Sequence, residues 1–188
     1  MKDILHEIIK DNGLSQDKVI LVGGLAISFY IDLAVSRDVD FALVVEDYQK
    51  IQRTDEWGIK TVQYEWGYVD FLNPEHFVSE QHKGNEFISY IKQHRYFKKE
   101  GLYVANPEVV FYTRLVVPTW ESHISKIIRD LNAGLIGKKD MIFKGIKAIA
   151  DVFSTRDLIN PRLNVLDQFI ESYFNDSIKP KYLKGSKT

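Results

Sequence analysis

Two aspartates separated by one residue, Asp38 and Asp40, stand at the start of an apolar run that extends to residue 45. Successive side chains of a strand point to opposite faces, so we expect both carboxylates on one face and Val39 and Phe41 on the other. Neighbouring carboxylates repel one another, and a cation between them allows both to stay ionised. Oxygen ligands alone suit Mg²⁺ or Mn²⁺ better than zinc. The pair therefore indicates a metal site, although two solvated aspartates at a strand end would give the same pattern.

A glycine pair, Gly23-Gly24, separates the apolar run 19–22 from a stretch with helical periodicity, residues 25–33. Glycine lets backbone N–H groups approach an anion closely, and the start of the following helix adds a favourable dipole. The pair indicates a phosphate-binding turn, although a tight turn that needs two glycines would look the same. Combined with the aspartates, it predicts a site for a metal-bound triphosphate.

A third aspartate, Asp70, lies inside another apolar segment, residues 68–72, with Val69 and Phe71 on the opposite face. Adjacent strands lie ~4.8 Å apart. If this strand neighbours the strand that begins at Val39, in a suitable register, the Asp70 carboxylate comes close to the first pair.

These residues resemble the signature of the nucleotidyltransferase superfamily, whose fold is that of DNA polymerase β: a Gly-Gly turn, a helix, and the segment 36–41, Ser-Arg-Asp-Val-Asp-Phe. The resemblance implies an enzyme that moves a nucleoside monophosphate from an NTP to an acceptor hydroxyl, with two Mg²⁺ (or Mn²⁺) ions as cofactors. It implies that Asp38 and Asp40 are metal ligands, and that Asp70 is a third ligand that helps to activate the attacking hydroxyl.

One departure from the family concerns the phosphate-binding turn. Many members have Ser directly after the first glycine, where this chain has Gly24. Phosphate contacts would then depend on the backbone amides of Gly23 and Gly24 and on Ser28 and Arg37. The Gly-Gly-Leu-Ala variant resembles bacterial branches that include AbiEii-type toxin enzymes, which implies a toxin-like function with a cognate antitoxin as partner.

Two questions stay open at this point. The acceptor could be an RNA end, a protein or a small molecule, and the pattern does not identify the NTP, ATP included. The alternative to an enzyme is a non-catalytic relative that keeps the fold and regulates or binds a partner. The complete set of three aspartates favours the enzyme.

Composition sets limits on the class of protein. The 188 residues are 45% hydrophobic and carry a net charge of −1, so there is no overall basic character of the kind that nucleic-acid-binding proteins show. Cysteine is absent, which excludes disulfides and thiol chemistry and fits a reducing compartment. The first residues are too charged for a signal peptide, and no apolar run approaches membrane-spanning length. We therefore expect a cytoplasmic protein with no membrane association.

The predicted fold is α+β, with a mixed-sheet lobe over residues 1–105, a helical lobe over 106–178 and a polar tail over 179–188. Residues 59–64 and 68–72 are expected to form a hairpin that carries Asp70. Asp47 is expected to cap a helix over 46–54, and Asn106 with Pro107 to start another. Further helices are predicted over residues 2–11, 122–131, 140–153 and 163–174. Five basic residues of the second lobe could face either the site or solvent: Arg114, Lys126, Arg129, Lys138 and Lys139.

Overall fold

The computed structural model describes residues 2–31, 38–52, 59–99 and 101–174. Within these ranges, six strands form one mixed sheet in the order β3-β4-β2-β1-β6-β5. The pairs β2/β4 and β1/β6 are parallel, and the other neighbours are antiparallel. The strands are β1 (Val19–Val22), β2 (Val39–Leu43), β3 (Ile59–Tyr64), β4 (Gly67–Leu72), β5 (Tyr96–Lys99) and β6 (Leu102–Ala105). The predicted α+β class and the β3/β4 hairpin are confirmed, whereas β5 was not predicted.

The centre of the sheet is strand β1, whose four residues are all buried. Helix α2 (Gly23–Ser28) packs on β1 and β2, and α4 (Gly84–His94) packs on β1 and β5. A strand covered on both faces needs an uninterrupted apolar run, which residues 19–22 supply. The remaining helices of this sheet lobe are α1 (Lys2–Asp11), α3 (Val45–Lys50) and the short 3₁₀ turns η1 (Gln16–Lys18) and η2 (Pro74–Phe77).

Helix α2 differs from the predicted one. It begins at Gly23 itself, within the glycine pair, and ends at Ser28. The expected helix over 25–33 is therefore shifted and shortened among the described residues.

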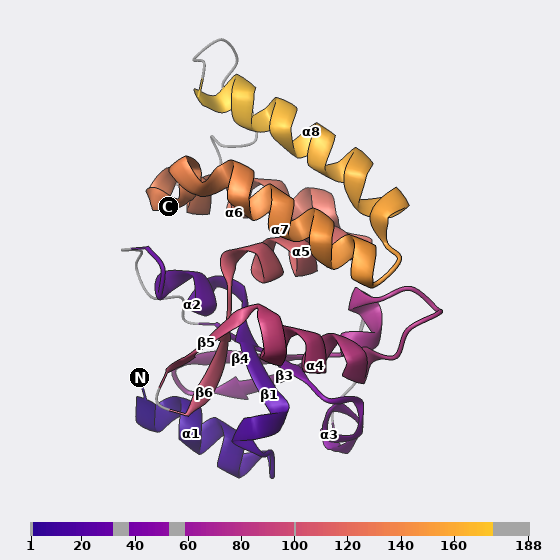
Figure 1. Cartoon of the computed structure of the whole chain (residues 1–188). Coiled ribbons are helices and arrows are strands. Elements are labelled where there is room, and N and C mark those ends of the chain that lie inside the picture. The colour runs from indigo at the N-terminus through magenta and orange to yellow at the C-terminus, as the bar shows by residue number, and fades with distance from the viewer. Residues whose placement is uncertain (1, 32–37, 53–58, 100, 175–188) are drawn as a thin grey trace.

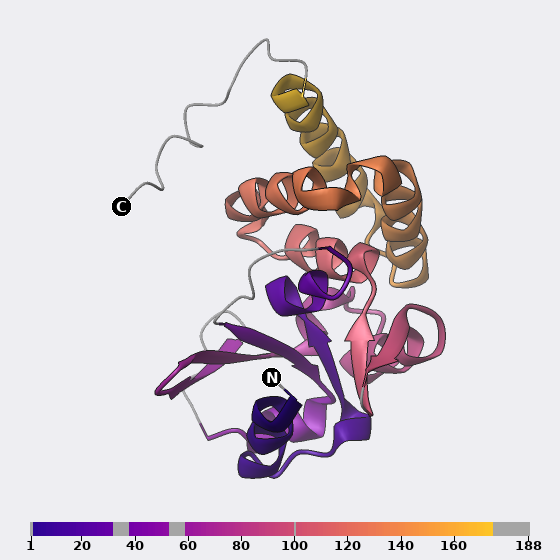
Figure 2. The ribbon, with the colours of Figure 1, turned by 90° about the vertical axis from the view of Figure 1, so that its left-hand side faces the viewer.

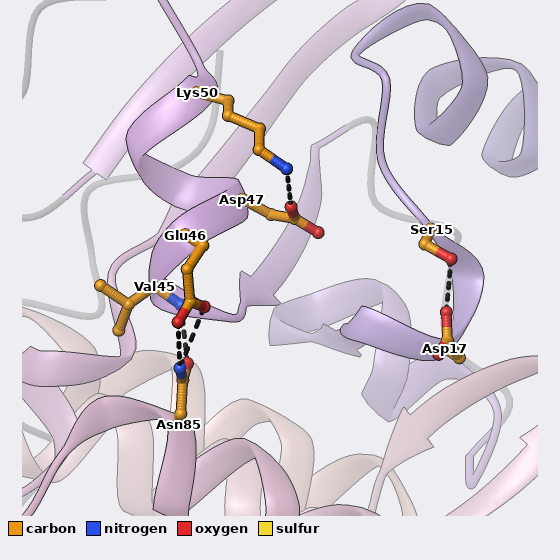
Figure 3. Close-up of polar contacts among 7 residues, drawn as sticks. All are labelled: Ser15, Asp17, Val45, Glu46, Asp47, Lys50 and Asn85. Atoms are coloured by element: carbon orange, nitrogen blue, oxygen red, sulfur yellow. Dashed lines mark hydrogen bonds and ion pairs between the residues drawn. The ribbon is translucent and has the colours of Figure 1, made fainter.

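Helix α3 corrects the predicted cap. The helix begins at Val45, and the carboxylate of Asp47 accepts a hydrogen bond from Lys50 Nζ at 2.6 Å instead of capping it. The Val45 amide donates to Asn85 Oδ1 of α4 at 2.8 Å, and Asn85 Nδ2 donates to the Glu46 carboxylate (Figure 3). The start of α3 is thus satisfied by a residue distant in sequence. Figure 3 also shows Ser15 bonded to Asp17 beside η1.

The helical lobe, residues 107–174, lies over one end of the sheet lobe, and α5 is its nearest helix to the sheet (Figures 1 and 2). Every residue of α5 is buried, with Pro107 in its first turn as predicted. Asn106 stands at the cap position, but its Oδ1 accepts from Tyr30 Oη at 2.8 Å. The elements are α5 (Pro107–Val116), η3 (Trp120–His123), α6 (Ile124–Asp130), the π-turn η4 (Leu131–Leu135), η5 (Ile136–Lys138), α7 (Lys139–Val152) and α8 (Arg156–Phe174).

Two expected helices have different bounds in the structure. The predicted 122–131 helix is the shorter α6, framed by η3 and η4, and α8 starts well before residue 163 and contains Pro161. In the described residues, no helix is long and apolar enough to cross a membrane.

Polar contacts join the two lobes on several sides of α5. Tyr112 Oη donates to the Phe77 carbonyl and Arg95 pairs with Glu108 at 3.3 Å, while Tyr112 also bonds to Thr155 Oγ1 within the helical lobe. These contacts fix α5 relative to the sheet edge.

Candidate functional site

Asp40 and Asp70 occupy directly opposed positions on the parallel neighbours β2 and β4. Adjacent strands lie ~4.8 Å apart. The alternate positions of both strands are buried on the other face, where the rings of Phe41 and Phe71 stack with centroids 6.2 Å apart. Because the apolar face is held in the core, both carboxylates lie on the same side of the sheet.

The electrostatics of Asp40 reflect this crowding. Burial, and then the negative charge of Asp70, raise the pKa of Asp40 to about 6, while the positive charges of Arg114 and Lys126 act in the opposite direction. Asp38 adds a smaller upward contribution to the same pKa. A cation bound here would favour the ionised carboxylate.

A neighbouring strand orients Asp70. Thr61 is its partner in the β3/β4 register, and Thr61 Oγ1 donates to Asp70 Oδ1 at 2.6 Å. The sequence analysis did not identify Thr61. The signal was available, since a hydroxyl at that position of the expected hairpin faces the same side as Asp70.

Gly23 makes room for the Asp40 side chain. Its φ of +67° lies in the left-handed region that favours glycine. A Cβ on Gly23 would stand 1.8 Å from Asp40 Oδ2 and 2.8 Å from Asp40 Cβ, so the carboxylate would have to leave its present position, and rotation of the side chain would not relieve the contact with Cβ. The first glycine of the predicted phosphate turn is therefore required by a carboxylate of the site itself.

A pocket of about 410 Å³ separates the aspartates from the helical lobe. Asp38, Asp40 and Asp70 line it together with both glycines of the pair. Its opposite side comes from α5, η3, α6 and the segment that joins α5 to η3. The residues there include Arg114, Val117, Pro118, Thr119, His123, Lys126 and Arg129.

The lining of the pocket shows which basic residues of the helical lobe face the site. Arg114, Lys126 and Arg129 line it, whereas Lys139 bonds to Asp167 of α8 at 2.6 Å. Asp130, fully buried, binds Arg114 at 2.6 Å through one oxygen and Arg129 at 2.7 Å through the other. One buried carboxylate thus holds two guanidinium groups at the pocket, and the cationic side keeps a net positive charge.

The remaining predicted residues lie in different places. Asp38 is exposed and lines the pocket. Ser28 Oγ donates to the Leu25 carbonyl at 2.7 Å, and Ser28 is not among the residues that line the pocket. Arg37 lies outside the described residues.

No protein-family model and no curated protein matches this chain. Carboxylates on one side and guanidinium and ammonium groups on the other suit a ligand that is itself anionic and carries a divalent cation.

The donor atoms fit magnesium chemistry. Among the residues that the structure describes, no group of three or more His, Cys, Asp or Glu side chains is arranged to hold a metal ion. Magnesium commonly takes only one or two carboxylates and completes its shell with water and phosphate oxygens. The opposed pair Asp40 and Asp70 meets that smaller requirement.

Proposed function

We propose that this chain is a metal-dependent nucleotidyltransferase that moves a nucleoside monophosphate from an NTP to an acceptor hydroxyl. The observation that supports it most strongly is the pairing of Asp40 with Asp70, in register on adjacent strands, across a pocket from Arg114, Lys126 and Arg129. The resemblance of residues 23–41 to the nucleotidyltransferase signature supports the same reaction.

In this proposal the acidic residues bind the metal and the basic residues bind the triphosphate. Asp38, Asp40 and Asp70 would hold Mg²⁺ or Mn²⁺, which in such sites neutralises charge on the attacking and leaving oxygens. Arg114, Lys126 and Arg129 bind the triphosphate, since guanidinium and ammonium groups pair well with phosphate oxygens.

Asp70 also accepts a hydrogen bond from the acceptor hydroxyl, aligns it for in-line attack on the α-phosphate, and takes up its proton as the attack proceeds. The oxygen–phosphorus bond to the acceptor forms as the bond to pyrophosphate breaks. The pocket walls contribute by holding the reacting groups in line, which is a large part of catalysis in phosphoryl transfer.

A non-catalytic nucleotide-binding regulator is the second candidate. It is favoured by the engagement of Asp70 with Thr61 and by the lack, in the described ranges, of an assembled three-ligand metal group. Both candidates bind Mg²⁺-NTP, and only the enzyme transfers label.

The biological setting follows from the proposed reaction and the resemblance. The acceptor is an RNA end, a protein or a small molecule, and the setting is the cytoplasm. A toxin-like activity, held in check by a cognate antitoxin, is the form of the proposal that the Gly-Gly-Leu-Ala variant supports.

The test is an incubation of the protein with each α-³²P-labelled NTP, Mg²⁺ or Mn²⁺, and a bacterial lysate. We expect label on RNA, protein or a small molecule, abolished by chelator and reduced by roughly a hundredfold or more in Asp40→Asn and Asp70→Asn. Asp140→Asn, an exposed carboxylate on α7, is the matched control and should transfer normally.

Calorimetry on the same proteins separates the outcomes. Mg²⁺-NTP binding without transfer to any acceptor supports the regulator instead. Absence of both binding and transfer contradicts the enzyme and the regulator alike.

A further inference from the structure

The helical wall of the pocket also carries uncharged residues beside its cationic groups. Val117 and Pro118 bring apolar surface to it, and Thr119 and His123 bring uncharged polar groups. These residues follow directly after α5, at the end of the pocket wall that also carries Arg114.

His123 supplies an unsatisfied hydrogen-bonding group to this wall. Its Nδ1 is buried and has no hydrogen-bond partner. Burial, followed by the charges of Lys126 and Arg114, lowers the pKa of His123 to about 4, so the imidazole is neutral at physiological pH. The other ring nitrogen, Nε2, is neither among the buried atoms nor hydrogen-bonded within the described residues, so the imidazole can offer it to a ligand in the pocket.

Helix α8 and a local turn hold the segment that carries His123. Arg162 of α8 donates to the carbonyls of Leu115 and Val117, and its guanidinium lies over the Trp120 ring, 5.3 Å from the centroid. Ser122 Oγ donates to the Thr119 carbonyl at 2.8 Å. The segment is therefore fixed before any ligand arrives, as a specificity site requires.

We propose that His123, with Val117 and Pro118, forms the nucleobase-binding part of the pocket, and that the His123 imidazole is the residue that discriminates among NTPs. This inference rests on the proposed function. A neutral imidazole adds no positive charge for binding phosphate, a role that the proposed function already gives to Arg114, Lys126 and Arg129. A nucleobase fits the apolar and neutral polar surface, because its faces are apolar and its edges carry donors and acceptors.

The alternative ligand for this part is the ribose. A sugar presents hydroxyls in every direction and gains little from Val117 and Pro118, whereas a flat base covers them. Because every NTP carries the same ribose, only contact with the base makes the affinity depend on which NTP is offered.

The test measures binding rather than turnover. Calorimetry in Ca²⁺, with ATP, GTP, CTP, UTP and inorganic tripolyphosphate, compares the wild type with His123→Ala. We expect the wild type to prefer one NTP, and His123→Ala to weaken that NTP by about tenfold, the loss of one buried hydrogen bond. Tripolyphosphate affinity should change by less than about twofold, since the imidazole is neutral.

Three further variants serve as controls. His123→Gln keeps a hydrogen-bonding group near the position of Nε2 and should restore most of the preference. Lys126→Ala, which leaves the ion pairs of Asp130 intact, should weaken every NTP and tripolyphosphate together. His82→Ala, a histidine that bonds to Glu86 in the sheet lobe, should change nothing in these measurements.

The outcomes separate this inference from the proposed function. If the wild type binds all four NTPs equally, or if His123→Ala weakens tripolyphosphate as much as the preferred NTP, His123 does not discriminate and the inference fails alone. If the wild type binds neither NTP nor tripolyphosphate, the proposed function fails and the inference with it. If His123→Ala unfolds earlier in urea, it is replaced by His123→Asn, which is too short to reach the position of Nε2. An NTP preference in His123→Asn equal to that of the wild type overturns the assignment.

Discussion

The two sides of the pocket position their charges by different means. On the sheet side, main-chain hydrogen bonds set the register that opposes Asp40 to Asp70, and the side chains that carry the charge are short. On the helical side, long side chains carry the charge, and a single buried carboxylate, Asp130, holds two of them. The acidic side therefore depends on the integrity of a sheet, whereas much of the basic side depends on one ion-pair network. Substitutions should affect the two sides unequally.

The largest change in stability is expected from Asp130→Ala, which removes the ion pairs of the helical side and leaves the sheet side unchanged. It leaves Arg114 buried without its partner, and removal of one member of a buried ion pair typically costs 3–5 kcal/mol. Urea unfolding should show a loss of about that size. Asp167→Ala removes the more exposed bond to Lys139 and should cost about 1 kcal/mol or less. Equal losses in the two variants would mean that Asp130 has no special part in holding the basic side.

On the sheet side, Asp40→Asn is expected to have a smaller effect on the free energy of unfolding, and it should raise this free energy instead of lowering it. The pKa of Asp40 is about 6 in the folded protein, above the usual ~3.9 of an unfolded aspartate. The folded state therefore binds the proton of the Asp40 carboxyl more tightly than the unfolded state does. Protonation of Asp40 makes its full contribution to the free energy of unfolding below about pH 4, and this contribution is lost as the pH rises through 6.

Removal of the charge should stabilise the metal-free protein by roughly 1–3 kcal/mol at pH 7.5 and by almost nothing at pH 4. Unfolding curves in urea at both pH values measure the difference, with Asp140→Asn as the exposed control. A destabilised Asp40→Asn protein at pH 7.5 would show that Arg114 and Lys126 more than offset the repulsion from Asp70.

The smallest effect is expected at the hydrogen bond between β3 and β4. Thr61→Val removes the hydroxyl that orients Asp70 at an exposed position, so the free energy of unfolding should fall by about 0.5–1 kcal/mol. Thr61→Ser keeps the hydroxyl and should retain most of the bond, apart from the lost methyl group. If the serine and valine variants are equally stable, the Thr61–Asp70 bond does not contribute.

The sheet side was largely predictable because its determinants are local. Alternation around Asp40 and Asp70 sets which side chains share a face, and the turn at 65–67 sets the hairpin. That the two carboxylates share one side of adjacent strands follows from those patterns once β4 pairs with β2. The segment before Asp38 is the exception, since Arg37 falls outside the described residues.

The helical side was much less predictable, because its contacts join residues far apart in sequence. Nothing around Asp130 distinguishes it from a solvated aspartate, and only the packing of α5 against α6 brings Arg114 to it. The same holds for Asn85, which caps α3 from another helix, and for His123, which lines the pocket only because the helical lobe lies over the end of the sheet lobe. Local patterns indicate that such helices exist, but they do not reveal which polar groups meet.

Gly23 and Asp40 are linked in a way that bears on how this chain can vary. A Cβ at position 23 would lie 1.8 Å from Oδ2 of Asp40, so the residue at each of the two positions restricts which residues the other can carry. A Cβ at position 23 would also stand 2.8 Å from the Cβ of Asp40, so only glycine at position 40 would remove every contact, and that change discards the carboxylate. A chain in which only one of the two residues has changed therefore either has a steric clash between positions 23 and 40 or lacks the carboxylate. For as long as selection keeps the carboxylate of Asp40, no single substitution at position 23 can be accommodated.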